Sequence, residues 1–118
     1  MGASEGVFQT EREFKIGAGD FALLAGARYH PFSLRSVLYE RQNLGAVDLF
    51  LEVVDGDRVY QIDSATAMTD RFYSWPNTDS PEKFDLTPPQ RVRLRVIGGA
   101  NPAENQSAAI TWAELGAP

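Results

Sequence analysis

The chain has 118 residues, a formal net charge of -5 and a pI of about 4.7. The length suits one domain with one core, and a hydrophobic content of 43% argues against disorder. The acidic balance argues against general binding of nucleic acid or anionic lipid, because such binding depends on Lys and Arg that neutralise phosphates. Since the chain contains no cysteine, disulfides and thiolate chemistry are excluded.

The first part of the chain predicts an arm rather than a targeting segment. It lacks the basic and apolar regions of a secretion signal, and no apolar run approaches the roughly 18 residues that span a bilayer. We therefore expect no membrane partner. Residues 1–6 are small and polar, which indicates an N-terminal arm followed by a single domain over residues 7–118. In this region we expect Gly2, Val7 and Phe8 to contact another subunit.

Alternating apolar and polar residues predict strands along most of the chain. Residues 7–16 alternate with one break, whereas residues 20–30 are compatible with either a helical turn or a short strand. In residues 32–41 the alternation places on one face Phe32, Leu34, Ser36 and Leu38. In residues 46–54 it places on one face Val47, Leu49, Leu51 and Val53.

The second half of the chain continues the pattern. The Asp55-Gly56 step between two apolar runs is a strong signal for a β-hairpin. A strand near residues 65–75 leads into an irregular loop, residues 91–97 form the clearest strand, and residues 106–115 predict the last one, with Trp112 in the core. Short strands about 8–12 residues apart, without an amphipathic helix, predict an all-β fold. We expect a single antiparallel β-sandwich or jelly-roll-like domain of about six to eight strands.

The strand at residues 91–97 carries an arginine at every second position: Arg91, Arg93 and Arg95. Because side chains alternate across a strand, these arginines share the face opposite the apolar one. The favoured interpretation is an outer face whose arginines pair with acids on neighbouring strands, such as Asp48, Glu52 or Glu114. Contact with a protein partner is the second interpretation, for which the three arginines are our candidate residues. The acidic pI makes nucleic acid the least favoured partner.

The segment FYSWPN at residues 72–77 groups aromatic residues beside a proline. Such residues plug the end of a sandwich or lie in subunit interfaces, and we therefore assign Tyr73, Trp75 and Pro76 to a partner interface. A platform that stacks on sugars is the alternative. It would make the chain a carbohydrate-binding module that uses Tyr73 and Trp75.

No arrangement of residues in the sequence indicates catalysis. His30 is the only histidine, and no G-x-S-x-G element supports a Ser-His-Asp triad. A small hydrolase that pairs His30 with a carboxylate is a third, less favoured function. Asp55, Asp57 and Asp63 lack the ordered series of an EF-hand calcium loop. We therefore expect no enzyme activity, no metal and no cofactor.

Three segments between residues 49 and 115 resemble a known class of protein: the loop FYSWPNTDSPEKFDL, the basic strand PPQRVRLRV, and the Gly-Gly turn into QSAAITWAEL. In these segments the chain resembles small all-β accessory proteins of tailed-phage virions. The resemblance implies a non-enzymatic structural protein that decorates the capsid, or acts as a minor capsid or connector protein. Its location would be the virion, with the cytoplasm as the alternative. Its partners would be the major capsid protein or other virion proteins, with a homo-oligomer as a further option.

Overall fold

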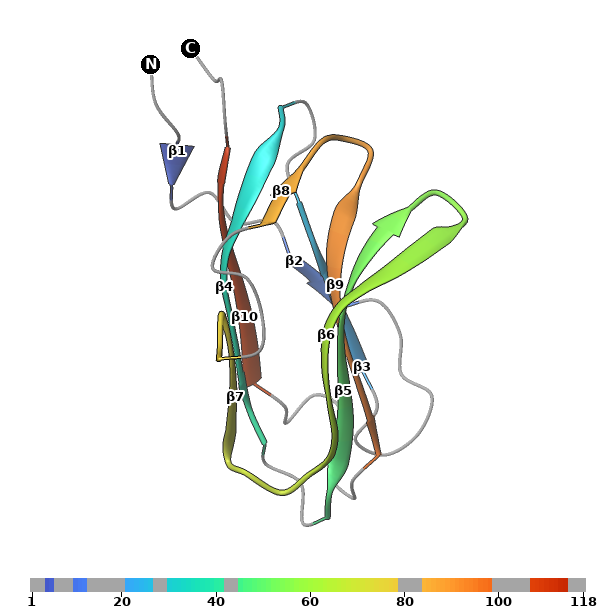
Figure 1. Cartoon of the computed structure of the whole chain (residues 1–118), viewed down its shortest axis with the longest axis vertical. Helices are drawn as coiled ribbons and strands as arrows, with labels where there is room; N and C mark the ends of the chain where they lie inside the picture. Colours follow the sequence, from blue (N-terminus) through green and yellow to red (C-terminus); the bar gives the residue numbers. More distant parts are fainter. Residues whose placement is uncertain are drawn as a thin grey trace.

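A computed structural model describes residues 4–5, 10–12, 21–26, 30–41, 45–78, 84–98 and 107–114. Within these ranges every regular element is a β-strand, which confirms the predicted all-β class. The strands form two antiparallel sheets that face each other as a sandwich (Figure 1). The predicted contacts of Gly2, Val7 and Phe8 lie outside the described residues and stay predictions.

The two sheets are named here after one of their central strands. The β4 sheet runs in the order β1 (Ser4–Glu5), β10 (Ser107–Glu114), β4 (Phe32–Glu40) and β7 (Phe72–Trp75), with β8 (Phe84–Leu86) pairing beside the start of β4. The β9 sheet runs in the order β2 (Thr10–Arg12), β3 (Phe21–Ala25), β9 (Arg91–Gly98), β5 (Val47–Asp55) and β6 (Arg58–Met68). The ambiguous segment at residues 20–30 therefore contains a strand, β3.

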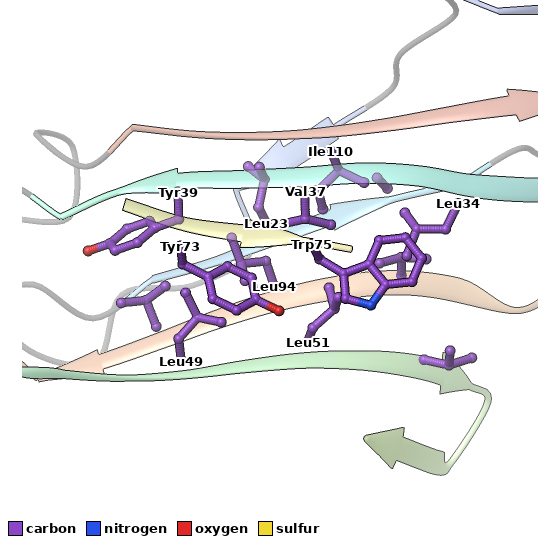
Figure 2. Packing of buried hydrophobic residues seen from close by; sticks show 14 of the residues in the cluster. Leu23, Leu34, Val37, Tyr39, Leu49, Leu51, Tyr73, Trp75, Leu94 and Ile110 are labelled. Carbon is purple, nitrogen blue, oxygen red and sulfur yellow. The ribbon is translucent and has the colours of Figure 1, made fainter. Parts of the chain in front are cut away.

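The hydrophobic core fills the space between the sheets. Figure 2 shows the rings of Tyr73 and Trp75 of the β4 sheet in the space between that sheet and the strand that carries Leu49 and Leu51. The predicted inner face of β5 is confirmed, since its apolar residues are at most 2% exposed: Val47, Leu49, Leu51 and Val53. The apolar face of β9 and the predicted core position of Trp112 are confirmed in the same way. Each such side chain contributes about 1.5–3 kcal/mol on burial, so the apolar residues determine which face of each strand lies against the core.

The face predicted for β4 is correct for its first half and wrong for its second. Phe32 and Leu34 are fully buried, as the alternation predicts. Leu38, which the same alternation places beside them, is 49% exposed. Val37 and Tyr39 point into the core in its place and are at most 1% exposed. The strand therefore reverses its two faces part of the way along.

A β-bulge causes this reversal. In the pairing of β10 with β4, Thr111 lies opposite Ser36, but the next residue, Trp112, lies opposite Leu34. The residue between, Arg35, is the extra residue of the bulge. Because side chains alternate with a period of two, one inserted residue moves every later side chain of β4 to the opposite face.

β5 and β6 form the predicted hairpin. β5 ends at Asp55 and β6 begins at Arg58, so the turn has two central residues. Gly56, the first of them, has a φ of 60°, which glycine adopts without a steric cost at Cβ. This arrangement is typical of a type II′ hairpin turn. In Figure 1 the turn of this hairpin stands away from the β4 sheet.

The connection from β6 to β7 crosses between the sheets and is held by Arg41, which follows β4. Its Nε donates to the carbonyl oxygen of Asp70 at 3.0 Å, and its Nη2 donates to the carbonyl oxygen of Thr69. Its backbone N–H donates to the carbonyl oxygen of Arg71 at 2.6 Å. These bonds fix the start of β7 beside the end of β4.

Part of the predicted arm belongs to the chain's own sheet. Ser4 pairs with Glu114 and Glu5 pairs with Ala113, so β1 extends the edge of β10 by two residue pairs. Edge strands offer unpaired backbone groups to such short segments.

Candidate interaction surfaces

The arginines of β9 lie on the outer face of the β9 sheet, and two of them share one carboxylate. Glu52 of β5 lies opposite Arg93 and is only 5% exposed. Arg93 donates through Nε to Glu52 Oε1 at 3.0 Å, and Arg95 donates through Nη2 to Glu52 Oε2 at 3.0 Å. The Arg95 guanidinium also lies over the Phe50 ring, 4.5 Å from its centre, which is a cation–π contact.

These contacts confirm the prediction that arginines of β9 pair with an acid on a neighbouring strand, and Glu52 is that acid. The prediction was wrong for Glu114, which lies on β10 in the other sheet. It was also wrong for Asp48, whose Oδ1 accepts the backbone N–H of Ala67 at 2.8 Å. Because Glu52 binds two guanidinium groups, Arg93 and Arg95 offer a partner much less charge than the sequence suggests.

The interface predicted at FYSWPN is wrong for Tyr73 and Trp75. Tyr73 is 6% exposed and Trp75 is 1% exposed, because β7 turns both side chains into the core (Figure 2). The large area of these rings favours the inner face, which leaves Phe72 and Ser74 on the outer one. A buried ring cannot stack on a sugar, so the carbohydrate-binding alternative loses its platform. Pro76 is exposed and stays a candidate contact.

Tyr73 links the two sheets on the side where β7 is the edge strand of the β4 sheet and β6 is the edge strand of the β9 sheet. Its hydroxyl donates to Asp63 Oδ2 of β6 at 2.6 Å, and Asn77 Nδ2 donates to the same oxygen at 2.9 Å. A hollow of about 300 Å³ lies here, lined by these three residues among others. Since the polar groups of the hollow bond one another, their clearest effect is to tie β6 to β7.

The environment of Tyr73 changes its ionisation. Burial, followed by the hydrogen bond to Asp63 and the negative charge of that carboxylate, raises the pKa of the Tyr73 hydroxyl above its usual value of 10.0. The folded protein therefore holds this hydroxyl protonated at a pH where an exposed tyrosine ionises.

We expect Tyr73→Phe to lower the free energy of unfolding at neutral pH by about 1 to 2 kcal/mol, because Asp63 loses a donor while the ring still packs. The raised pKa adds a pH dependence. The unfolded chain ionises its tyrosines near pH ~10, whereas folded Tyr73 stays protonated, so its contribution to stability is lost as the pH rises above about 10. Denaturant unfolding measured between about pH 8 and pH 11 should show a weaker decline for Tyr73→Phe than for the wild type.

Tyr60→Phe is the matched control, since Tyr60 is 46% exposed. It should keep the alkaline decline of the wild type. An equal decline in Tyr73→Phe and the wild type would contradict the assignment of this pH dependence to Tyr73.

Four large apolar side chains of the described residues are about half exposed, and they form two surfaces. Val59 (48%) and Tyr60 (46%) lie near the turn of the β5–β6 hairpin, on its two opposite faces because they are consecutive in β6, and are called here the hairpin tip. Leu38 (49%) and Phe72 (51%) lie on neighbouring strands of the β4 sheet, on its outer side, and are called here the Leu38–Phe72 face. Single exposed apolar residues are ordinary, but neighbouring ones mark interaction surfaces. The sequence prediction missed both surfaces, because only strand pairing shows which of these residues point outward.

Three further findings concern metals, membranes and relatives. In the ranges that the structure describes, no group of three or more His, Asp or Glu side chains is placed to hold a metal ion. In the same ranges no helix has the length and apolar character needed to cross a membrane. No protein-family model matches the sequence, and no curated protein matches it either.

Proposed function

We propose that the chain is a non-enzymatic structural subunit that acts through contacts with other protein subunits of a larger assembly. The observation that carries this proposal is the hairpin tip, where Val59 and Tyr60 are half exposed on the two faces of a paired two-stranded element. The assembly is a virion, a proposal that rests on the resemblance of residues 49–115 to phage accessory proteins. The partners are the major capsid protein or other virion proteins, and the role is capsid decoration, minor capsid or connector protein.

The chemistry of the hairpin tip suits a protein partner. The Tyr60 hydroxyl accepts a long hydrogen bond from Arg58 Nη1 at 3.4 Å, so an aromatic ring and a cation lie side by side. Tyr and Arg are among the residues that contribute most to protein interfaces. A hairpin held by its ladder also loses little conformational entropy when a partner covers it.

Each contact of this kind is weak by itself. A partner that encloses both faces of the hairpin covers the exposed halves of Val59 and Tyr60 and gains about 2 kcal/mol, since burying one whole side chain of this size contributes about 1.5–3 kcal/mol. A micromolar complex needs about 8 kcal/mol. Repeated copies in an assembly overcome this deficit through multivalency, provided that each copy offers more than one surface. The Leu38–Phe72 face is the second surface.

Substitution of the hairpin tip tests the proposal. We expect the wild-type chain to co-purify with virus particles on a density gradient. The double variant Val59→Ser with Tyr60→Ser should weaken its binding about thirtyfold and lower its occupancy accordingly, because it loses about 2 kcal/mol and each ~1.4 kcal/mol changes binding tenfold. Quantitative mass spectrometry of the particles measures the occupancy. Thr66→Ala, an exposed residue of the same strand, is the control.

Thermal unfolding of the double variant checks that its fold is intact. Particles that lack the wild-type chain would overturn the virion role. Equal occupancy of the wild type and the folded double variant would instead overturn the role of the hairpin tip.

A further inference from the structure

We propose that a second copy of this chain packs on the Leu38–Phe72 face, so that two outer surfaces of the β4 sheet meet across a two-fold axis. The inference rests on the proposed function in one respect, since it names one of the partners of an assembly subunit. It differs from that function in its surface, its partner and its test.

The apolar part of the face is continuous across β7, β4 and β10. Leu38 lies opposite Ser74 of β7 and Ala109 of β10, and directly paired residues point to the same side of a sheet. Phe72 lies opposite Glu40, two residues from Ser74, so it is the diagonal neighbour of Leu38. Diagonal neighbours have Cα atoms about 7–8 Å apart, within reach of an aromatic side chain.

Small side chains surround these two apolar residues. The outward residues that pair along this part of the sheet are Ser36 with Thr111, Leu38 with Ala109, and Glu40 with Ser107. A sheet surface with short side chains is nearly flat, and flat sheet faces pack against each other at about 10 Å. Leu38 and Phe72 of one copy can therefore lie over the short side chains of the other.

The charges of the face select a second copy as its occupant. Arg71 Nη2 lies 2.7 Å from Glu40 Oε2, and Arg71 Nε donates to the same oxygen at 2.9 Å. The Arg71 side chain is 72% exposed and its guanidinium lies 5.1 Å from the centre of the Phe72 ring. Arg71 and Glu40 thus place a cation and an anion beside the apolar pair. A two-fold axis brings Arg71 of each copy to Glu40 of the other, so the surface is complementary to itself.

The outer face of the β9 sheet does not offer a second copy complementary charges in this way. On the outer face of the β9 sheet, Glu52 is 5% exposed and already holds Arg93 and Arg95 within one chain. Its charges have little to gain from a second copy. On the Leu38–Phe72 face, Glu40 is also paired within one chain and its side chain is 26% exposed, but the Arg71 side chain is 72% exposed, so a second copy can reach its guanidinium. An ion pair near the surface contributes less than about 1 kcal/mol until a partner covers it.

The area available sets the strength of the dimer. Three strands about 4.8 Å apart, each contributing about five residues at 3.3 Å, cover on the order of 240 Å². A stable interface buries about 800 Å² per partner. We therefore expect a weak dimer that forms at high protein concentration and that an assembly reinforces.

Two variants, each with one of these charges reversed, test the inference. Sedimentation velocity of the wild type over a wide range of concentration should show a shift from the 13.0 kDa monomer toward the dimer. Glu40→Arg alone and Arg71→Glu alone should each lose this shift, because like charges then meet across the axis. An equimolar mixture of the two variants should recover it, since each introduced charge then faces its opposite.

Two further variants complete the test. The double variant Leu38→Ser with Phe72→Ser should raise the dissociation constant of the dimer about tenfold or more and should still fold. Asp57→Arg makes the same charge change as Glu40→Arg at an exposed turn residue and should associate like the wild type. A wild type that stays monomeric, or a mixture that associates no better than its components, overturns the inference. Neither result affects the hairpin tip, whose test is the occupancy of particles.

Discussion

Trp75→Ala is expected to lower the free energy of unfolding by about 3–5 kcal/mol, which is the usual loss when a large buried ring is removed from a core. Trp75 is 1% exposed and is among the largest fully buried side chains of the described residues. Figure 2 shows its indole between the sheets, on the side of Leu51. The loss combines the lost burial of the ring with the cavity that the neighbouring side chains cannot close.

Thermal unfolding followed by circular dichroism measures this effect. For a domain of this size, about 1 kcal/mol corresponds to roughly 4 °C, so we expect Tm to fall by about 12–20 °C. Phe72→Ala is the matched control, because Phe72 belongs to the same strand but is 51% exposed. It should cost less than about 1 kcal/mol. Equal losses in the two variants would contradict the placement of Trp75 in the core.

Glu52→Ala is the second large effect that we expect, with a loss of about 3–5 kcal/mol. Glu52 is 5% exposed and accepts hydrogen bonds from both Arg93 and Arg95. Its removal takes away the carboxylate that two guanidinium groups on the same side of one strand share. The side chains of these arginines are only 19% and 27% exposed, so water replaces the carboxylate poorly.

Urea unfolding of Glu52→Ala and Glu40→Ala compares a buried pair with an exposed one. Glu40 also binds an arginine, but the Arg71 side chain is 72% exposed, and such surface pairs contribute about 0–1 kcal/mol. A triple variant with Glu52, Arg93 and Arg95 all replaced by leucine should recover most of the stability, because apolar residues can substitute for a complete buried ion network. If Glu52→Ala and Glu40→Ala lose the same stability, the network does not support the β9 sheet.

The parts of the fold that the sequence predicts well are those with long, unbroken alternation. β5 and β9 each keep one apolar face over their length, and both are central strands whose inner faces are buried as predicted. The hairpin between β5 and β6 is predictable because Gly56 makes a two-residue turn favourable. Local patterns of this kind need no knowledge of the neighbouring strand.

The parts that the sequence does not predict depend on pairing between distant segments. The bulge at Arg35 exists only in the register of β4 against β10, and it decides that Leu38 faces outward. β7 has four residues, which is too short for alternation to show that Tyr73 and Trp75 point inward. The strand order selects Glu52 from several acids as the partner of the arginines. The hairpin tip and the Leu38–Phe72 face can therefore be identified only when the pairing of the strands is known.

Cryo-electron microscopy of purified virus particles tests most directly whether this sandwich is a repeated structural component. We expect a small two-sheet domain at symmetry-related positions, with the hairpin tip against a neighbouring protein and two copies joined at their Leu38–Phe72 faces. Complete particles that contain no such density, from a host that makes this chain in quantity, would contradict the proposed function.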